Sequence, residues 1–337
     1  MKRFANLAPK HGFREKYGYS NIMFIAAAML IEKKTGLTWE QFIQQRIFRP
    51  LEMRSSSSTM MGFKASLNKA VPHVNNNPNP YIDYNNAAGA VGINSNITDL
   101  SKWVTMWLNN GKFGDKQILK ENTVREIMAM QTPQAVSAKS EENGVTLRGA
   151  ASGWMVQTYK GMRVVHHSGG LPGFILNIAL VPEKKAGVIV LTNGETRIPF
   201  AMTNYVLDLL SVGKVKDWTT EYLAAGANKP EEKAVVKEPV IFKNTELVGD
   251  YEDKMYGKAT ISINKEKAIL TLEPTKQLFT AELEPLYKTT YRIKFADPFL
   301  PEGKVTFQLN SSGQIISFGI DLPNPDFNFY NLKFVKN

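Results

Sequence analysis

Apolar positions in the early part of the chain follow the spacing of helices. A strongly apolar stretch over residues 21–34 ends at Gly36, which suits the left-handed residue that closes a helix, so we expect a buried helix here. Thr38, with Gln41 three residues later, is a capping-box signature. It predicts a second, closely linked helix that stops at Pro50.

The stretch that follows has little periodicity. Residues 54–96 are rich in Ser, Asn, Pro and Gly, so they predict a long irregular loop of the kind that often carries binding function. Thr98 is then expected to cap a helix over residues 99–109, and another helix fits residues 120–130. A further helix is predicted over residues 199–210.

The middle of the chain changes to a period of two. Three β-rich runs, residues 162–168, 174–181 and 187–193, are separated by turns that contain Gly or Pro. They predict an antiparallel meander. Together with the surrounding helices, this makes residues 1–225 an expected domain of helices packed on an antiparallel sheet, which gives the chain an α+β fold class.

The last third of the chain predicts a different architecture. Residues 226–239 have the charge and Pro content of a linker. The short alternating runs over residues 240–337 are typical of a small all-β barrel or sandwich. Its many aromatic residues are expected to form the core of this domain rather than a ligand cage.

Composition narrows the choice of chemistry and partner. A chain of 337 residues is long enough for two domains, and the absence of Cys excludes disulfides, thiolate metal sites and a Cys nucleophile. No window approaches the apolar length of a membrane helix. The net charge of +10 falls within residues 1–240, because residues 241–337 hold 12 basic and 12 acidic residues. The basic residues are scattered singly, so no nucleic-acid partner is expected.

The first candidate for chemistry is Tyr19-Ser20-Asn21, directly before the first predicted helix. In an extended segment Tyr19 and Asn21 project to the same side, so a phenol able to relay a proton and an amide able to hold a carbonyl could share a pocket. The alternative is a Tyr at a helix entrance with Asn21 as the N-cap.

The second candidate is His167-Ser168-Gly169-Gly170, at the end of a predicted strand. His167 and Gly169 face the same side, and a residue without Cβ lets a substrate lie against the strand while backbone N–H groups remain able to donate. The alternative is an ordinary strand end that runs into a Gly-rich turn. His166 points to the opposite face from His167, so the pair cannot bind one metal.

The four histidines lack metal-ligand spacing, and no phosphate-loop or dinucleotide fingerprint occurs. Neither a metal nor a cofactor is therefore expected.

Several motifs, taken in order, resemble the serine β-lactamase family, and most closely its class C enzymes, low-molecular-weight penicillin-binding proteins and esterases. They run from Tyr19-x-Asn21 through Thr35-Gly36, residues 47–53 (Ile-Phe-Arg-Pro-Leu-Glu-Met), Ala88-Gly89, Thr98-Asp99-Leu100 and Lys102-Trp103 to His167-x-Gly169-Gly170-Leu-Pro-Gly-Phe174. No single piece is specific, but their shared order makes chance resemblance improbable.

The resemblance implies a serine hydrolase that acts on an amide or ester, such as a β-lactam, a D-Ala peptide or an ester, through an acyl-enzyme. Tyr19 would then assist proton transfer, and Asn21 would contact the substrate amide or a motif lysine. His167 with Gly169 would form the strand motif, and the Gly170 N–H would be one of two oxyanion donors. Histidine in place of the usual lysine makes the charge depend on pH, so carboxylate recognition would be weaker.

The resemblance also implies a small-molecule or peptidoglycan-like substrate and, by analogy, a location outside the cytoplasm. The residues themselves do not fix the compartment.

The chain departs from the family at the nucleophile. The family's S-x-x-K motif stands on a helix before Y-x-N, whereas the 18 residues before Tyr19 contain no Ser. Ser66-x-x-Lys69 lies in the Asn- and Pro-rich loop, and Ser262-x-x-Lys265 lies in an alternating strand where the two side chains face opposite ways. Neither is therefore expected to be the nucleophile.

We expect the nucleophile and the early strands of the central sheet to lie outside this chain. A sheet without those strands would expose an edge and an apolar face, which favours self-association. The alternative is a non-catalytic family member that keeps the pocket to bind a peptide or a cell-wall fragment.

Overall fold

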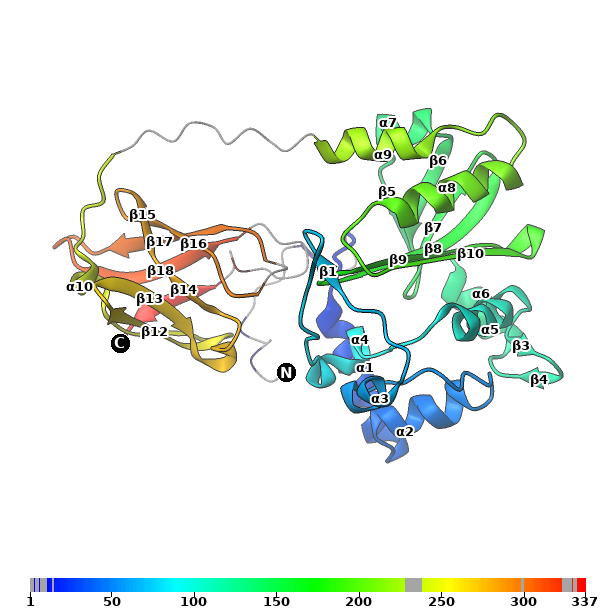
Figure 1. Ribbon diagram of the computed structural model, residues 1–337, viewed down its shortest axis with the longest axis horizontal. Helices are drawn as coiled ribbons and strands as arrows, with labels where there is room; N and C mark the ends of the chain where they lie inside the picture. Colours follow the sequence, from blue (N-terminus) through cyan, green and yellow to red (C-terminus); the bar gives the residue numbers. More distant parts are fainter. Residues whose placement is uncertain are drawn as a thin grey trace. The chain divides into compact units, whose positions relative to one another are not determined.

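The computed structural model describes residues 3, 6, 11–13, 15–227, 238–297, 300–322, 329 and 332–337. The chain divides into two compact units (Figure 1). One is Phe13–Lys229, and the other combines Pro230–Asn337 with Met1–Gly12. Most of the predicted linker, residues 226–239, lies outside the described residues.

The larger unit opens with the predicted pair of helices. α1 spans Asn21–Thr35 and ends at Gly36, which has the left-handed φ of 71° that its position requires. The capping box of Thr38 and Gln41 is present and starts α2, Trp39–Ile43, which continues as the π-helix η2, Gln44–Phe48. Both helices are confirmed in type and place.

The predicted burial of α1 is wrong. Ala28 is its one buried residue, while Met23 and Leu30 are 65% and 57% exposed. The physical reason is that α1 packs on the short helix α4, Ala88–Val91, and on α2, and these cover only a narrow stripe of it. An apolar composition indicates that a helix needs packing partners, but it does not indicate how much of the helix those partners cover.

The predicted long loop is largely irregular, although it contains short elements. These are α3 Met60–Ala65, β1 His73–Val74, β2 Asn77–Pro78, η3 Asn85–Ala87 and α4. It leads into α5, Ile97–Leu108, whose N-cap is Asn96 rather than the predicted Thr98. The Asn96 side chain accepts a hydrogen bond from the backbone of Asp99 at 3.0 Å, so the helix begins two residues earlier than expected.

Asp99, in the family-like motif Thr98-Asp99-Leu100, has a structural role. Its carboxylate is buried and accepts hydrogen bonds from Ser55 N at 2.8 Å and Ser56 Oγ at 2.9 Å. These bonds fasten the start of the long loop to the first turn of α5. After a small hairpin, β3 Lys112–Phe113 with β4 Lys116–Gln117, the predicted helix over 120–130 is α6, Glu121–Met128.

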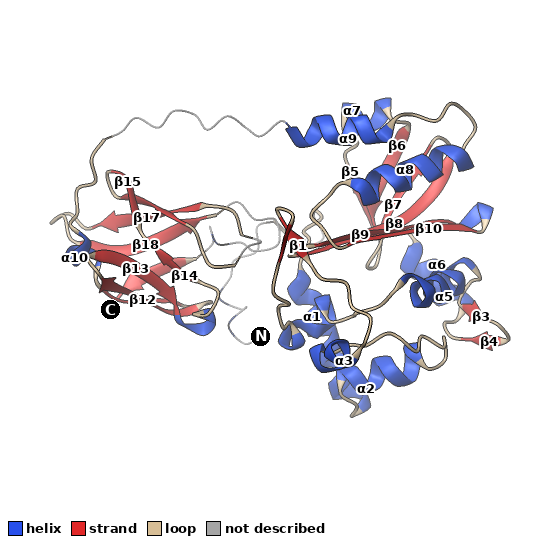
Figure 2. Ribbon diagram, in the orientation of Figure 1, coloured by secondary structure: helices blue, strands red, loops and turns tan. Residues whose placement is uncertain are grey.

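A six-stranded antiparallel sheet forms the centre of this unit (Figure 2). Each strand pairs with the next along the chain, so the predicted meander is confirmed and extends to strands that were not predicted. The strands are β5 Thr132–Gln134, β6 Val145–Ala150, β7 Met155–Tyr159, β8 Met162–Leu171, β9 Phe174–Val181 and β10 Ala186–Thr192. The remaining helices are α7 Ala138–Glu142, η4 Pro182–Lys184, α8 Ile198–Leu210 and α9 Trp218–Ala227.

Helices cover both faces of this sheet (Figure 1). On one face Val165 and Leu180 pack with Trp107 of α5, and on the other Val164 and Ala179 pack with Leu207 of α8. Adjacent residues of β8 thus enter opposite cores, as the period of a strand requires. None of the described helices has the length and apolar content needed to cross a membrane.

The second unit is the predicted all-β domain, and it is a nearly closed nine-stranded antiparallel barrel. Its strand order is β14-β13-β12-β11-β19-β18-β17-β16-β15, and β14 and β15 are consecutive in the chain. The elements are α10 Asn244–Leu247, β11 Gly249–Asp253, β12 Gly257–Asn264, β13 Lys267–Leu272, η5 Glu273–Thr275, β14 Thr280–Glu282, β15 Glu284–Tyr287, β16 Thr290–Ile293, β17 Gly303–Leu309, β18 Ile315–Asp321 and β19 Lys333–Lys336.

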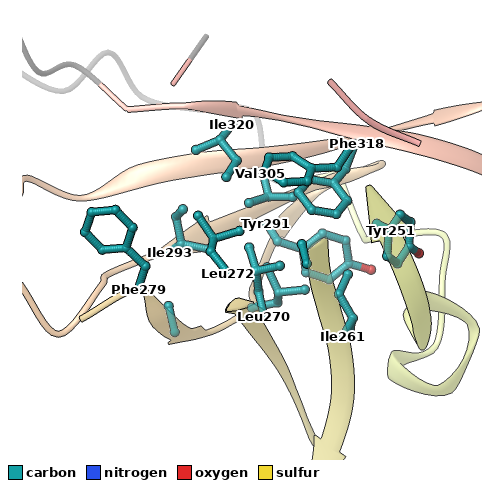
Figure 3. Close-up of a cluster of buried hydrophobic side chains, with 14 of the residues drawn as sticks. Tyr251, Ile261, Leu270, Leu272, Phe279, Tyr291, Ile293, Val305, Phe318 and Ile320 are labelled. Carbon is teal, nitrogen blue, oxygen red and sulfur yellow. The ribbon is translucent and has the colours of Figure 1, made fainter. Parts of the chain in front are cut away.

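Aromatic side chains lie in the barrel core, as predicted, together with aliphatic side chains (Figure 3). The Phe318 ring stacks on Phe334 at 4.8 Å and meets the edge of Tyr251 at 5.0 Å. Predicted core aromatics at positions 299, 327 and 330 lie outside the described residues. The start of the chain belongs to this unit, because Arg3 and Asn6 donate hydrogen bonds to backbone carbonyls of the turn between β11 and β12.

Candidate active site

The start of α1 places two of the predicted site residues. Ser20 is the N-cap, with extended φ and ψ of −153° and 105°, and Asn21 is the first helical residue. Asn21 is therefore not the N-cap, which corrects that part of the alternative, whereas Tyr19 does lie at the helix entrance. The Asn21 side chain is engaged instead by the Tyr19 hydroxyl, which donates to its Oδ1 at 3.1 Å. The Tyr19 phenol and the Asn21 amide thus lie in direct contact.

His167 lies beside this pair, although it is far away in the sequence. The rings of Tyr19 and His167 have their centroids 6.5 Å apart with an interplanar angle of 39°. Tyr19 is 43% exposed and His167 is half-buried, so both rings remain accessible to a ligand. The structure therefore brings Tyr19, Asn21 and His167 together at one place on the larger unit.

The strand that carries His167 has an open edge at this place. β7 pairs with β8 only as far as His166, whereas β9 pairs with β8 from Val165 to Leu171. On the β7 side, no strand among the described residues pairs with residues 167–171. The strand also continues through Gly169 and Gly170, and it ends at Leu171 before the turn Pro172-Gly173.

The strand register tells which backbone groups face this edge. The two-residue loop Pro172-Gly173 closes on the Leu171–Phe174 pair, so that pair exchanges hydrogen bonds. Since antiparallel pairs alternate, Leu171 and Gly169 direct their N–H and C=O groups to β9, and Gly170 and Ser168 direct theirs to the open edge. The Gly170 N–H therefore has the direction that an oxyanion donor at this edge needs.

The hairpin at the other end of β8 assigns the same backbone directions along this strand. The two-residue loop Lys160-Gly161 closes on the Tyr159–Met162 pair. Met162 thus directs its N–H and C=O groups to the β7 side of the strand, and so do the even-numbered residues after it. Beyond His166 this side is the open edge, so Ser168 and Gly170 face it.

The two adjacent histidines have different surroundings. The ring of His167 has Nδ1 2.6 Å from the carbonyl oxygen of Ser168. His166 points to the opposite face, where burial above all, and then the positive charges of Arg148 and His167, lower its pKa to about 4. No group of three His, Cys, Asp or Glu side chains suited to a metal ion occurs among the residues the structure covers.

The two Ser-x-x-Lys matches do not form a nucleophile pair. Ser66 follows the last residue of α3, and its hydroxyl donates to Asn68 O at 3.1 Å. The Lys69 ammonium donates to the backbone carbonyl of Ser66 rather than to its hydroxyl. Ser262 lies in β12, and Lys265 lies in the turn beyond that strand.

The tip of the β8–β9 hairpin is held by the long loop, which the sequence did not reveal. A Cβ atom at Gly173 would lie 2.5 Å from both His73 N and Pro72 Cβ, so only glycine allows this approach. Asn193 donates to Val71 O at 2.9 Å and fixes the same loop to the end of β10. These contacts hold the C-terminal end of β8, next to its open edge, against the long loop.

A hollow of about 420 Å³ adjoins the candidate site, and three tryptophans line it. Trp103 and Trp107 come from α5, Trp154 precedes β7, and His167 and Ser168 also line the hollow. Sequence reasoning missed this feature. The available signal was the spacing of four between two tryptophans on one helix, next to a Trp at a strand start.

Comparisons with known families place both parts of the chain. Residues 1–212 match the family model described as Beta-lactamase, and residues 243–336 match a domain of unknown function, DUF3471. The chain therefore belongs to the beta-lactamase family, which confirms the resemblance seen in its motifs.

Two relatives are similar to more than half of this chain. Unguisins hydrolase ungD' of Aspergillus campestris is 30% identical over 206 residues, which cover 58% of this chain and 37% of that protein. The D-alanyl-D-alanine-carboxypeptidase/endopeptidase AmpH of Escherichia coli K12 is 23% identical over 222 residues, which cover 63% of this chain and 51% of that protein. The chain thus spans roughly a third to a half of the length of these relatives.

A solved structure has the same overall fold. It is the octameric penicillin-binding protein homologue from Pyrococcus abyssi, with a TM-score of 0.52 and 17% identity over 98% of this chain and 66% of that one.

Proposed function

We propose that the larger unit carries part of an acyl-transfer site for amides or esters, of the β-lactamase and penicillin-binding-protein type. The observation that carries the proposal is the gathering of Tyr19, Asn21 and His167 at the one stretch of β8 that lacks a strand neighbour on one side. A substrate backbone laid along this edge would pair with Ser168 and Gly170 as an added strand.

Each residue then has a role that its position supports. A serine hydroxyl attacks the substrate carbonyl, and its proton passes through the Tyr19 phenol to the leaving amine or alcohol. The Gly170 N–H donates to the oxyanion, and Asn21 holds the substrate amide. His167 and Gly169 form the strand motif that seats the substrate. Water then hydrolyses the acyl-enzyme and releases the acid.

None of the Ser-x-x-Lys matches in residues 1–337 is assigned as the nucleophile, because neither stands on a helix beside Tyr19. The proposal therefore includes a Ser-x-x-Lys segment in addition to these residues. The name of one relative favours an amide substrate, since it is a D-alanyl-D-alanine-carboxypeptidase/endopeptidase. A β-lactam or a D-Ala peptide is the substrate class that we propose to test first.

The test is covalent labelling with a fluorophosphonate probe and with a fluorescent penicillin. Residues 1–337 and the same chain extended by its upstream codons are compared. Labelling of the extended form, reduced at least tenfold by Tyr19→Phe, supports the acyl-transfer site. Tyr17→Phe is the matched control, since Tyr17 is a neighbouring exposed phenol outside the cluster. It is expected to leave labelling unchanged.

Absence of labelling in both forms would contradict acyl transfer. The open edge of β8 then favours the second candidate function, a pocket that binds a peptide or cell-wall fragment without chemistry. Reversible retention of D-Ala-D-Ala peptides, lost on Tyr19→Phe, is the result expected for that function.

We also propose that copies of the chain self-associate through the larger unit. The support for this is the outer strand β10, which has no second strand neighbour among the described residues, and the apolar side chains exposed nearby on α8.

A further inference from the structure

A lysine, an asparagine and a glutamate meet at the end of α7, outside the residues of the candidate active site. Asn143 is the C-cap of α7, Lys216 precedes α9, and Glu221 lies in the first turn of α9. The Lys216 ammonium donates to Asn143 Oδ1 at 2.7 Å and forms an ion pair with Glu221. Asn143 Nδ2 donates to Glu221 Oε1 at 3.0 Å. Each of the three side chains therefore contacts both of the others.

The lysine nitrogen lies beside a carbon atom that an amine can attack. Since a C=O bond is about 1.2 Å long, Lys216 Nζ lies within about 4 Å of Asn143 Cγ. Nζ also stands 4.9 Å from the centroid of the Trp218 ring, which is buried and so holds the lysine from one side. Two groups kept this close react as if at very high concentration, and a reaction that each chain performs only once needs no fast turnover.

Glu221 bridges the nitrogen that would attack and the nitrogen that would leave. One of its carboxylate oxygens pairs with Lys216 Nζ, and the other accepts the hydrogen bond from Asn143 Nδ2. Burial raises the pKa of Glu221, but the bonds from Lys216 and Asn143 outweigh it and hold the pKa below its ordinary value. The group is therefore an ionised carboxylate, in position to move protons from one nitrogen to the other.

We propose that Lys216 and Asn143 join in an intramolecular amide bond, with Glu221 as the base and then the acid. Glu221 takes a proton from the Lys216 ammonium, and the neutral amine attacks Asn143 Cγ. The Nζ–Cγ bond forms and the Cγ–Nδ2 bond breaks. Nζ loses two protons in all, and Nδ2 gains both of them and leaves as ammonium. The reaction consumes no water, oxidant or second substrate.

The bond would give this chain a covalent brace that its composition otherwise lacks. The two residues are 73 positions apart, and the chain contains no cysteine for a disulfide. Such a link would restrict the unfolded chain as a disulfide does, and it would tie the segment before β6 to the start of α9. It does not depend on the acyl-transfer function proposed above.

The test is the mass of the intact, purified full chain. Loss of ammonia should place the wild-type mass about 17 Da below the value calculated from the sequence. A tryptic digest should contain one branched peptide that joins Asn143 to Lys216. This digest is made on the wild-type chain, so the test does not require that any variant folds.

Two variants assign the roles. Lys216→Arg keeps the positive charge but supplies a guanidinium that stays protonated, so its mass should equal its calculated value. Glu221→Gln keeps the shape of the side chain and removes the base, so the modified fraction should fall at least tenfold after the same incubation. Lys139→Arg is the matched control, because Lys139 also pairs with Glu221, at 3.8 Å. It should show the full loss of ammonia.

Three outcomes would overturn the proposal. The first is a wild-type chain that keeps its calculated mass after several days at pH 9, which favours free amines. The second is a loss of ammonia in Lys216→Arg equal to that of the wild type. The third is a gain of about 1 Da at Asn143-Gly144, which would identify deamidation by water in place of the amide bond.

Discussion

The buried carboxylate of Asp208 joins α8 to the β7–β8 turn and to the segment before α9. It lies in α8 at 1% exposure, and its carboxylate accepts hydrogen bonds from Tyr159 Oη at 2.5 Å, Lys216 N at 3.0 Å and Trp218 Nε1 at 2.8 Å, with Lys160 forming an ion pair. Burial raises the pKa of this carboxyl, but the bonds from Lys160, Tyr159 and the others outweigh it and hold the pKa below its ordinary value.

We expect Asp208→Asn to lower the free energy of unfolding by roughly 2–4 kcal/mol at pH 7, because it breaks this set of bonds at a buried site. Since the folded pKa is lowered, the stabilisation is present above the unfolded pKa of about 3.9 and is lost as the pH falls through the folded value. Urea unfolding at pH 7 and below pH 4 measures both effects. Asp115→Asn, in an exposed turn, is the control. Equal losses in the two variants would contradict this account.

His166 is a second buried group with a lowered pKa, but here the fold favours the uncharged form. Its folded pKa of about 4 lies below the unfolded value of about 6.5, because burial disfavours its charged form. Stability is therefore complete above pH 6.5 and falls between pH 6.5 and 4, by up to about 1.4 kcal/mol per pH unit, as the unfolded chain binds a proton. Chemical unfolding across this range should show the slope, and His166→Gln should flatten it. A wild-type curve without the slope would exclude this role.

At the scale of elements, the contact between α1 and α4 depends on one missing side chain. A Cβ atom at Gly89 would lie 2.6 Å from both Ala28 Cβ and the carbonyl oxygen of Phe24. The two helices therefore approach at a distance that only glycine allows. Since α1 begins at Asn21, two residues after Tyr19, this contact also positions the candidate site.

Gly89→Ala separates helix propensity from packing. Alanine is the better helix former by about 1 kcal/mol, so propensity alone predicts stabilisation. We expect a loss of roughly 1–3 kcal/mol instead, because the new methyl overlaps α1. Gly18→Ala is the matched control, since a Cβ there meets nothing within 4 Å. Thermal unfolding of the two variants decides between the effects, and a more stable Gly89→Ala would show that the helices can move apart.

Local signals in the sequence were sufficient for most elements. Gly36, the capping box at Thr38 and the apolar runs of β8, β9 and β10 act within a few residues, so their structures were predictable. The burial of α1 was not predictable, because it depends on which elements pack against that helix. The tryptophan pocket was missed for the same reason. Trp154 meets the α5 tryptophans only through the fold.

The candidate site was predictable only in part. Tyr19, Asn21 and His167 were chosen from local chemistry and from family-like motifs, and the structure places them together. Their catalytic roles stay predictions. What the sequence could not show is the open edge of β8, since that edge depends on where β7 ends.

At the scale of the whole molecule, the outer side of the sheet carries features that favour association. β10 is the outermost strand, its sequence Ala-Gly-Val-Ile-Val-Leu-Thr contains no charge and no Pro, and Leu191 is 37% exposed. Such an edge is a template for another strand. On α8, apolar side chains spaced by four, three and four residues form an exposed stripe, which consists of Ile198, Met202, Tyr205 and Leu209.

These two features predict reversible self-association of the full chain. Leu191→Lys puts a charge on the strand edge and Met202→Lys puts one in the middle of the α8 stripe, so each should lower the association constant at least tenfold. Leu67→Lys is the control, because Leu67 is fully exposed in the long loop and belongs to neither feature. Sedimentation velocity over a hundredfold range of concentration measures the effect. If only Met202→Lys acts, the helix stripe is the interface and the strand edge stays unpaired. If the wild-type chain sediments as a monomer at every concentration, the proposed self-association is wrong.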